Sequence, residues 1–270
     1  MIKLIRLEWM KFRKNSVVQM LLWIFIIFFP TLIFVGKEES LTANNPLLKP
    51  GVFFNFPTVW DWLGYDGNWM VFFALGFLVV YTISIEISYK TMRQNIITGL
   101  TRTEFFLSKL YIVLIFVLIA TVLYAITGFT IGWFHSADPS FAEAMDNDWA
   151  ISRFALMSLT YLLFAMFIGF AIKNSGLAVL TYLSYGILLE PMIRWLGHAQ
   201  IVEEGISKNL YPMNAAEDLM PMPFYQITQN MPNSDGALLL LSYKEAAITS
   251  GVYCVIFLGL TYYIFLKRDM

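Results

Sequence analysis

The chain has 270 residues, of which 58% are hydrophobic and only 14% are charged, whereas about 25% of the residues in a soluble globular chain are charged. This composition excludes a water-soluble fold. The 18 Lys and Arg nearly balance the 19 Asp and Glu, so no net charge attracts a polyanion and we expect no nucleic-acid partner. One cysteine, Cys254, and two histidines exclude a disulfide framework and leave no metal or catalytic site to predict.

Six uncharged runs predict membrane-spanning helices, because about 20 helical residues cross the hydrocarbon core. They lie between Lys14 and Lys37, Asp66 and Glu86, Lys109 and Asp138, Arg153 and Lys173, Lys173 and Glu190, and Glu245 and Lys267. The fifth run has only 16 residues and ends at Glu190 and Pro191, so we expect it to be short, tilted or broken at its end. The runs do not alternate, which favours helices over barrel strands. The predicted fold class is all-α, a polytopic membrane protein with a single domain over residues 1–270.

The basic residues divide unequally between the two sides of the membrane. Twelve of the 18 fall in residues 1–15, in residues 89–109, at Lys173 and after the sixth run, and six fall in longer connections on the other side. The positive-inside rule places the larger group, with both termini, in the cytoplasm. The first run is too long for the apolar core of a signal peptide, so we expect it to remain in the mature protein.

Two segments outside the runs predict contact with the membrane interface. Residues 2–14 place Ile2, Ile5, Trp9 and Phe12 on one helical stripe among basic residues, which predicts an interfacial helix. This helix either anchors the topology or also touches a cytoplasmic partner. Residues 37–68 contain aromatic residues that predict a belt at headgroup level: Phe53, Phe54, Phe56, Trp60, Trp62 and Tyr65.

The segment from Glu86 to Lys109 predicts a helix, a compact polar elbow and a returning helix. Glu86 and Lys90 have the i,i+4 spacing of a helical ion pair. Gly99 permits a sharp turn, and Thr101 and Glu104 have the spacing of a capping box. The simpler alternative is a well-capped loop without a further role.

These features together resemble the type-2 permease subunits of bacterial ATP-binding-cassette (ABC) exporters. The resemblance lies in the number of spans and in three segments: Leu4 to Phe12, Lys90 to Asn95, and Gly99 to Arg102. It implies that residues 1–15 form a connecting helix and that residues 89–109 form a coupling elbow that docks on an ABC ATP-binding subunit. It also implies that residues 194–245 form short re-entrant outer helices between spans five and six.

The resemblance also implies roles for individual residues. Those expected to act in the connecting helix are Ile5, Arg6, Trp9, Lys11 and Phe12. Those expected to couple to the ATPase are Lys90, Arg93, Gln94, Asn95, Thr98, Gly99, Leu100 and Arg102. Glu190 and Arg194 are a candidate outer gate, although we favour a simpler arrangement in which Arg194 pairs with Glu190 near the outer interface.

The predicted function is that of a membrane-spanning permease subunit of an ABC exporter in the bacterial inner membrane, surrounded by membrane lipid. The sequence has no phosphate-binding loop of the form G-x-x-x-x-G-K-[ST], so ATP and magnesium would be bound by the partner subunit. The family resemblance implies pairing with a second permease subunit, identical or similar. The alternative is a non-transporting membrane anchor or immunity component with the same fold. We expect no enzyme activity, because no span contains a catalytic or zinc-binding arrangement, and the transported substrate stays open.

Overall fold

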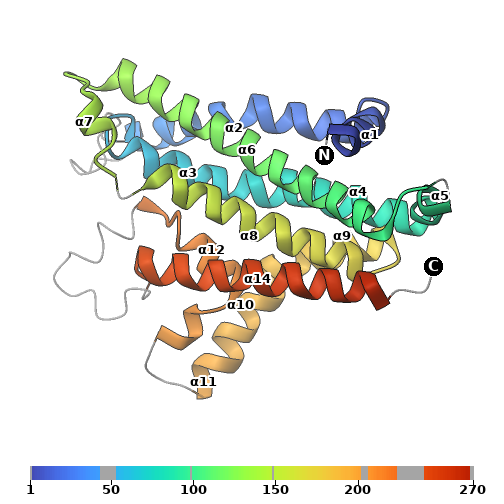
Figure 1. The fold of residues 1–270 in the computed structure, drawn as a ribbon. Coiled ribbons are helices and arrows are strands. Elements are labelled where there is room, and N and C mark those ends of the chain that lie inside the picture. The colour runs from blue at the N-terminus through green and yellow to red at the C-terminus, as the bar shows by residue number, and fades with distance from the viewer. Residues whose placement is uncertain are drawn as a thin grey trace.

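The structure, a computed structural model, describes residues 2–42, 53–97, 99–147, 149–201, 206–223 and 240–267. Every regular element in these ranges is a helix. Figure 1 shows long helices lying side by side, with α1 (Ile2–Phe12), α5 (Thr91–Ile97) and the last turn of α14 (Tyr243–Lys267) at one end. The short helix α7 (Phe141–Ala144) lies at the opposite end. We refer to these as the α5 end and the α7 end.

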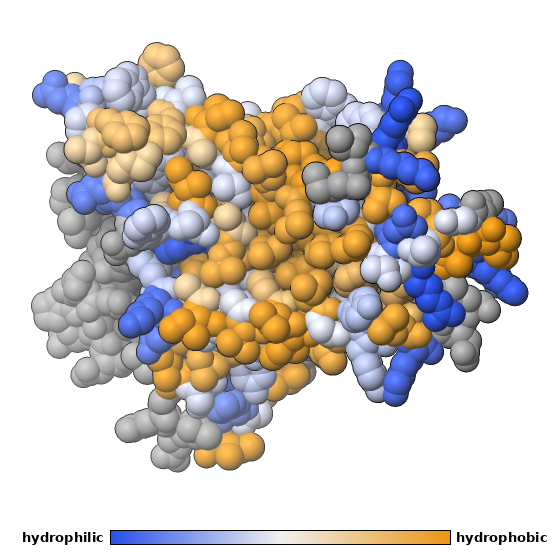
Figure 2. Space-filling model, viewed as in Figure 1, coloured by the Kyte–Doolittle hydropathy of each residue, from blue (hydrophilic) through white to orange (hydrophobic). Residues whose placement is uncertain are grey.

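Six helical stretches are long and apolar enough to cross a membrane, as the sequence predicts. They are Ser16–Phe34 in α2 (Ser16–Thr42), Val59–Ser88, α6 (Arg102–His135), α8 (Ala150–Ala171), Ser175–His198 and α14. Figure 2 shows a broad apolar belt across the middle of the molecule, with hydrophilic residues gathered toward the two ends. The chain is therefore an all-α, multi-pass membrane protein.

Helix α8 is the centre of the bundle. It packs against α4 (Phe77–Ser88), α6 and α14. Of its most apolar 18-residue stretch, 72% is buried within the protein. Its Phe154 ring is stacked on Tyr124 of α6 with 4.2 Å between the ring centroids. Because close packing replaces a hydrophobic driving force between helices in lipid, this central helix positions the others.

The second span begins earlier than the sequence predicts. It consists of α3 (Val59–Met70), the π-helical segment η3 (Val71–Gly76) and α4. Trp60 is buried in it, donates its indole N–H to the carbonyl of Ala144 and accepts the Tyr124 hydroxyl at its own carbonyl. Gly128 lies against the Trp60 ring, where a Cβ atom has no room. Five aromatic residues of the predicted belt are buried in the protein core and do not face headgroups: Phe53, Phe54, Phe56, Trp60 and Trp62. Their level in the membrane stays a prediction.

The fifth span is longer than predicted. It runs through α9 (Ser175–Ser184), η4 (Tyr185–Leu189), α10 (Glu190–Met192), η5 (Ile193–His198) and α11 (Ala199–Ile201). The helix does not break at Pro191, because the π-helical segments η4 and η5 on either side change the hydrogen-bond spacing around a residue that has no N–H. In Figure 1 its α10 and α11 portion leans away from the other long helices.

The last connection contains η6 (Ile206–Asn209) and α12 (Pro212–Glu217). Helix α12 packs against α8 and α14 and buries Met213, Ala215 and Ala216. Residues 202–205 and 224–239 of the predicted outer segment lie outside the described residues. The re-entrant arrangement of residues 194–245 and the interfacial position of α1 both stay predictions.

Candidate functional site

A network of four charged side chains joins three helices at the α5 end. Glu8 and Lys11 come from α1, Glu86 from α4 and Lys109 from α6. The Lys109 Nζ atom lies 2.7 Å from Glu8 Oε2 and 2.6 Å from Glu86 Oε1. The Lys11 Nζ atom lies 3.0 Å from Glu8 Oε1 and 3.0 Å from Glu86 Oε1. Two ammonium groups therefore balance two carboxylates.

The centre of this charge network is buried. Only 2% of the Lys109 surface is exposed, and its ammonium lies 5.2 Å from the centroid of the Phe105 ring. The Ser108 hydroxyl donates a further hydrogen bond to Glu8. Burial opposes the ionisation of Glu8, but the ammonium groups of Lys109 and Lys11 hold the pKa of that carboxyl below its usual value. Because a buried charge without its partner is strongly destabilising, the network fixes α1 against α4 and α6.

The charge network was missed in the sequence, and the predicted Glu86–Lys90 ion pair is wrong. Helix α4 ends at Ser88, and Lys90 is exposed with a left-handed φ of 56°. Glu86 instead turns toward Lys11 and Lys109. The available signal was Glu8, an acidic residue in an otherwise basic helix, but its partner Lys109 is 101 residues away.

The buried face of α1 also differs from the predicted stripe. The side chains of Leu4, Glu8 and Phe12 are buried at i, i+4 and i+8 spacing. The Phe12 ring is stacked on Phe116 of α6 with 5.9 Å between the centroids. Ile5 is half-buried, whereas Arg6 and Trp9 are exposed. Phe12 thus packs as an anchor, and Trp9 faces away from the protein.

The elbow has the turn chemistry that its sequence predicts. Gly99 has a φ of 113°, a backbone conformation that residues other than glycine rarely adopt. Thr101 caps α6: its hydroxyl accepts the N–H of Glu104, whose carboxylate accepts the N–H of Thr101. The N–H of Leu100 bonds the carbonyl of Asn95 and closes the turn. Thr98 lies outside the described residues.

Side chains connect the elbow to other parts of the bundle. The Thr91 hydroxyl donates to the carbonyl of Glu86. The Ser88 hydroxyl donates to the carbonyl of Lys173, in the connection between α8 and α9, at 2.6 Å. The Arg102 guanidinium donates to the carbonyl of Leu266, near the end of α14, at 3.2 Å. These hydrogen bonds connect the elbow and its flanking helices, α4 and α6, to the α8–α9 connection and to α14.

The outward side of the elbow combines basic and apolar groups. We call five of its exposed residues the elbow surface: Tyr89, Lys90, Arg93, Gln94 and Ile97. Beneath them Met92 is buried, and Asn95 and Leu100 are half-buried. Exposed apolar residues next to cations are typical of a surface that binds another protein.

The two candidate gate residues do not pair with each other. Glu190 is buried, and its carboxylate accepts the backbone N–H groups of Met213 and Asn214 at the start of α12. Arg194 donates instead to the carbonyl of Lys208 and to the side chain of Asn209. The favoured ion pair near the interface is thus wrong, because the last connection folds back and supplies backbone partners to both residues.

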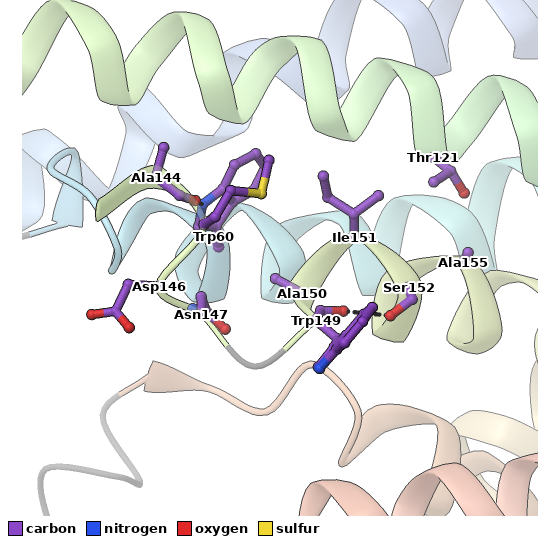
Figure 3. Close-up of a pocket in the computed structure, with 11 residues that line it drawn as sticks. Trp60, Thr121, Ala144, Asp146, Asn147, Trp149, Ala150, Ile151, Ser152 and Ala155 are labelled. Carbon is purple, nitrogen blue, oxygen red and sulfur yellow. Dashed lines mark hydrogen bonds between the residues drawn. The ribbon is translucent and has the colours of Figure 1, made fainter. Parts of the chain in front are cut away.

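A cavity of about 620 Å³ lies toward the α7 end between α6, α7 and α8 (Figure 3). Trp60 and Ala144 line one part of it, and Thr121 and Ile151 line another. Among its lining residues only Asp146 carries a formal charge. This cavity offers apolar volume and no arrangement of catalytic groups.

The six spans, the buried charge network and the capped elbow define a multi-pass membrane protein whose helices are tied together at the α5 end. A family model described as ABC-2 family transporter protein matches residues 4–189. The chain therefore belongs to the ABC-2 transporter family and is an ABC transporter permease. A permease of this family is a membrane transport component, not itself catalytic, and works in general with an ATP-binding subunit. No curated protein matches the sequence.

The matched residues include α1 from Leu4 onward, the elbow and the first four spans, and reach the middle of the fifth. The match thus contains every member of the charge network and the whole elbow surface. It ends before Arg194 and α12.

Proposed function

We propose that the chain is one half of an ABC exporter of the bacterial inner membrane, moved by a separate ATP-binding subunit that docks on the elbow surface. The observation that carries this proposal is the construction of the α5 end. An exposed basic and apolar surface lies on the elbow, between α4 and the capped start of α6, and both of these helices are tied to α1 by the buried charge network. In this arrangement the α5 end, with both termini, faces the cytoplasm, as the distribution of basic residues predicts.

The contacts around the elbow suggest how movement is passed on. A push on α5 reaches α4 and α6 directly, because these helices flank the elbow. Through Lys109 and Glu86 it reaches α1, which then moves with α4 and α6 as one body. Through Ser88 and Arg102 it reaches the α8–α9 connection and α14. Packed elements move as units and do not deform continuously, so a small displacement at α5 becomes a displacement of whole spans.

The fifth span is the surface that we expect a second permease subunit to cover. It has the lowest mean hydropathy of the six spans. Only 17% of its most apolar 18-residue stretch is buried within this chain. A helix of low hydropathy that is also poorly buried is badly suited to lipid on all sides. A second copy, or a similar permease, packed against α9 and η4 would bury it and form a pathway between the two subunits.

Charge reversal on the elbow surface tests the docking of the ATP-binding subunit. Arg93→Glu should reduce co-purification of the ATP-binding subunit by tenfold or more, because close charge pairs across an interface contribute about 1.5–7 kcal/mol. Insertion and folding should be unchanged, since Arg93 is exposed and outside the spans.

Lys244→Glu is the matched control, because Lys244 is equally basic and exposed but lies at the α7 end. Normal co-purification with Arg93→Glu, or an equal loss with both variants, would contradict the proposal.

A further inference from the structure

A second group of charged residues lines a cavity that the coupling mechanism does not use. The cavity, of about 160 Å³, lies between η5, η6, α12 and the chain just before α14. Arg194 and Lys208 line it with cations, and Glu217 and Asp218 line it with carboxylates. Within the residues that the structure describes, no ion pair joins either cation to either carboxylate. Opposite charges thus share one cavity without neutralising each other directly.

The charged groups retain capacity for a ligand. Arg194 uses Nε and one terminal nitrogen on Lys208 and Asn209, which leaves its other terminal nitrogen. The Lys208 ammonium lies 5.6 Å from the centroid of the Trp195 ring. Because each ammonium has three donors and a guanidinium has five, both cations can still bind a phosphate.

The two carboxylates also have oxygen atoms that accept no hydrogen bond within the described part of the chain. Asp218 accepts the Asn214 side chain and the N–H of Leu241 at Oδ2, which leaves Oδ1. The Glu217 carboxylate makes no hydrogen bond within the described part of the chain, and the residue is half-buried. Burial, with the nearby Asp218 carboxylate, raises the pKa of Glu217 to about 7. A carboxylate in this setting gains most from a bound cation, which would compensate its lost hydration.

The cavity also borders apolar surface at the level of a membrane span. Ile193, Trp195 and Leu196 are exposed on η5, the same segment that carries Arg194. This part of the fifth span leans away from the rest of the bundle (Figure 1). A molecule with a charged group in the cavity can therefore place apolar chains along these three residues. A free polar solute would leave this apolar surface unused.

We propose that the cavity binds the phosphoethanolamine headgroup of a membrane phospholipid. Its phosphate contacts Arg194 and Lys208, its ammonium contacts Glu217 and Asp218, and its acyl chains lie along Ile193, Trp195 and Leu196. The volume corresponds to about five water molecules at roughly 30 Å³ each, which is suitable for a small headgroup. The residues that line the cavity lie between Arg194 and Leu240 of this chain.

The chemistry of the cavity discriminates among headgroups. A primary ammonium donates three hydrogen bonds to the carboxylates, whereas the trimethylammonium of a choline headgroup has no N–H to donate. A glycerol headgroup carries no cation at all and would leave Glu217 and Asp218 facing a phosphate. Such unpaired or like-charged contacts are the usual source of specificity between similar ligands.

Native mass spectrometry of the purified full-length protein tests this proposal. The protein is incubated separately with phosphatidylethanolamine, phosphatidylcholine and phosphatidylglycerol of equal chain length. We expect about tenfold higher occupancy by phosphatidylethanolamine, because one hydrogen bond to a charged group is worth about 1.5–3 kcal/mol. Glu217→Gln and Lys208→Met should each reduce that occupancy about tenfold, while Asp138→Asn and Lys244→Met, exposed positions toward the same end, should not.

Equal retention of the three lipids, or wild-type occupancy in both pocket variants, would overturn the proposal. Binding of soluble phosphoethanolamine, which has no acyl chains, tests whether the acyl chains contribute to affinity. If it binds with the same affinity as the lipid, the acyl chains contribute nothing, and the assignment to a phospholipid is wrong. Gel filtration of each variant confirms that any loss of binding comes from a folded protein.

Discussion

Lys109 holds the α5 end together, because its ammonium contacts the carboxylates of both Glu8 and Glu86 in a buried position. Lys109→Met should lower the free energy of unfolding by about 3–5 kcal/mol, since it leaves the buried Glu8 carboxylate and the half-buried Glu86 carboxylate with one remaining cation. Lys173→Met is the control, an exposed lysine at the same end. Thermal unfolding in detergent measures both variants. Similar midpoints would show that the charge network contributes little to stability.

The ionisation of Glu8 makes the attachment of α1 depend on pH. Its pKa is lowered in the folded protein, so it contributes stability at pH values above the usual carboxyl range, near 4.3, and this contribution disappears as the pH falls below that range. The unfolding midpoint of the wild-type protein should therefore be higher than that of Glu8→Gln at pH 7. The difference should be unchanged down to about pH 5 and should shrink as the pH is lowered further, through the usual carboxyl range and then the lowered pKa of Glu8. A difference that is constant with pH would contradict the ion-pair account.

At the scale of elements, Gly99 gives the elbow its turn. A Cβ atom at Gly99 or at Gly251 would meet nothing within 4 Å, but only Gly99 has a positive φ, of 113°. Gly99→Ala should therefore lower the free energy of unfolding by about 1–2 kcal/mol through backbone strain. Gly251→Ala, in the middle of α14, should be neutral or slightly stabilising. Equal effects on the unfolding midpoint would mean that the turn tolerates other conformations.

Elements defined by local rules could be predicted from the sequence. The six spans follow from runs without charge, and the Thr101 cap follows from residues three positions apart. The start of the second span could not be predicted, because the uncharged run begins only after Asp66, whereas the helix also includes Asp61. In the structure Asp61 lies 3.6 Å from Arg153, which is buried on α8 and far away in the sequence.

In the candidate site, too, features set by neighbouring residues could be predicted, whereas contacts between distant residues could not. The elbow could be located from its glycine, its cap and its basic residues. The charge network could not, because Lys11 and Glu86 are 75 residues apart and Glu8 and Lys109 are 101 apart. The fifth span was misjudged for a different reason: Glu190 and Pro191 are ordinary helix-ending signals, but π-helical segments and backbone donors from α12 accommodate them.

At the scale of the whole molecule, the exposed fifth span predicts where two permease subunits meet. In a Cys254→Ala background, cysteine at Leu188 should be cross-linked in membranes to a second permease subunit. Cysteine at Val255, an equally apolar and exposed position on α14, should not. Efficient cross-linking at Val255 but not at Leu188 would move the interface to the sixth span.

The central claim is that the elbow surface docks on an ATP-binding subunit, and site-specific photo-cross-linking in native membranes tests it most directly. A photoreactive residue is placed at Ile97, which is 74% exposed on the elbow, or at Ile201, which is 84% exposed at the end of α11. Peptide mass spectrometry then identifies the captured protein. The account predicts that Ile97, but not Ile201, captures a protein with a phosphate-binding loop. Capture of such a protein from Ile201, or of none from Ile97, would contradict it.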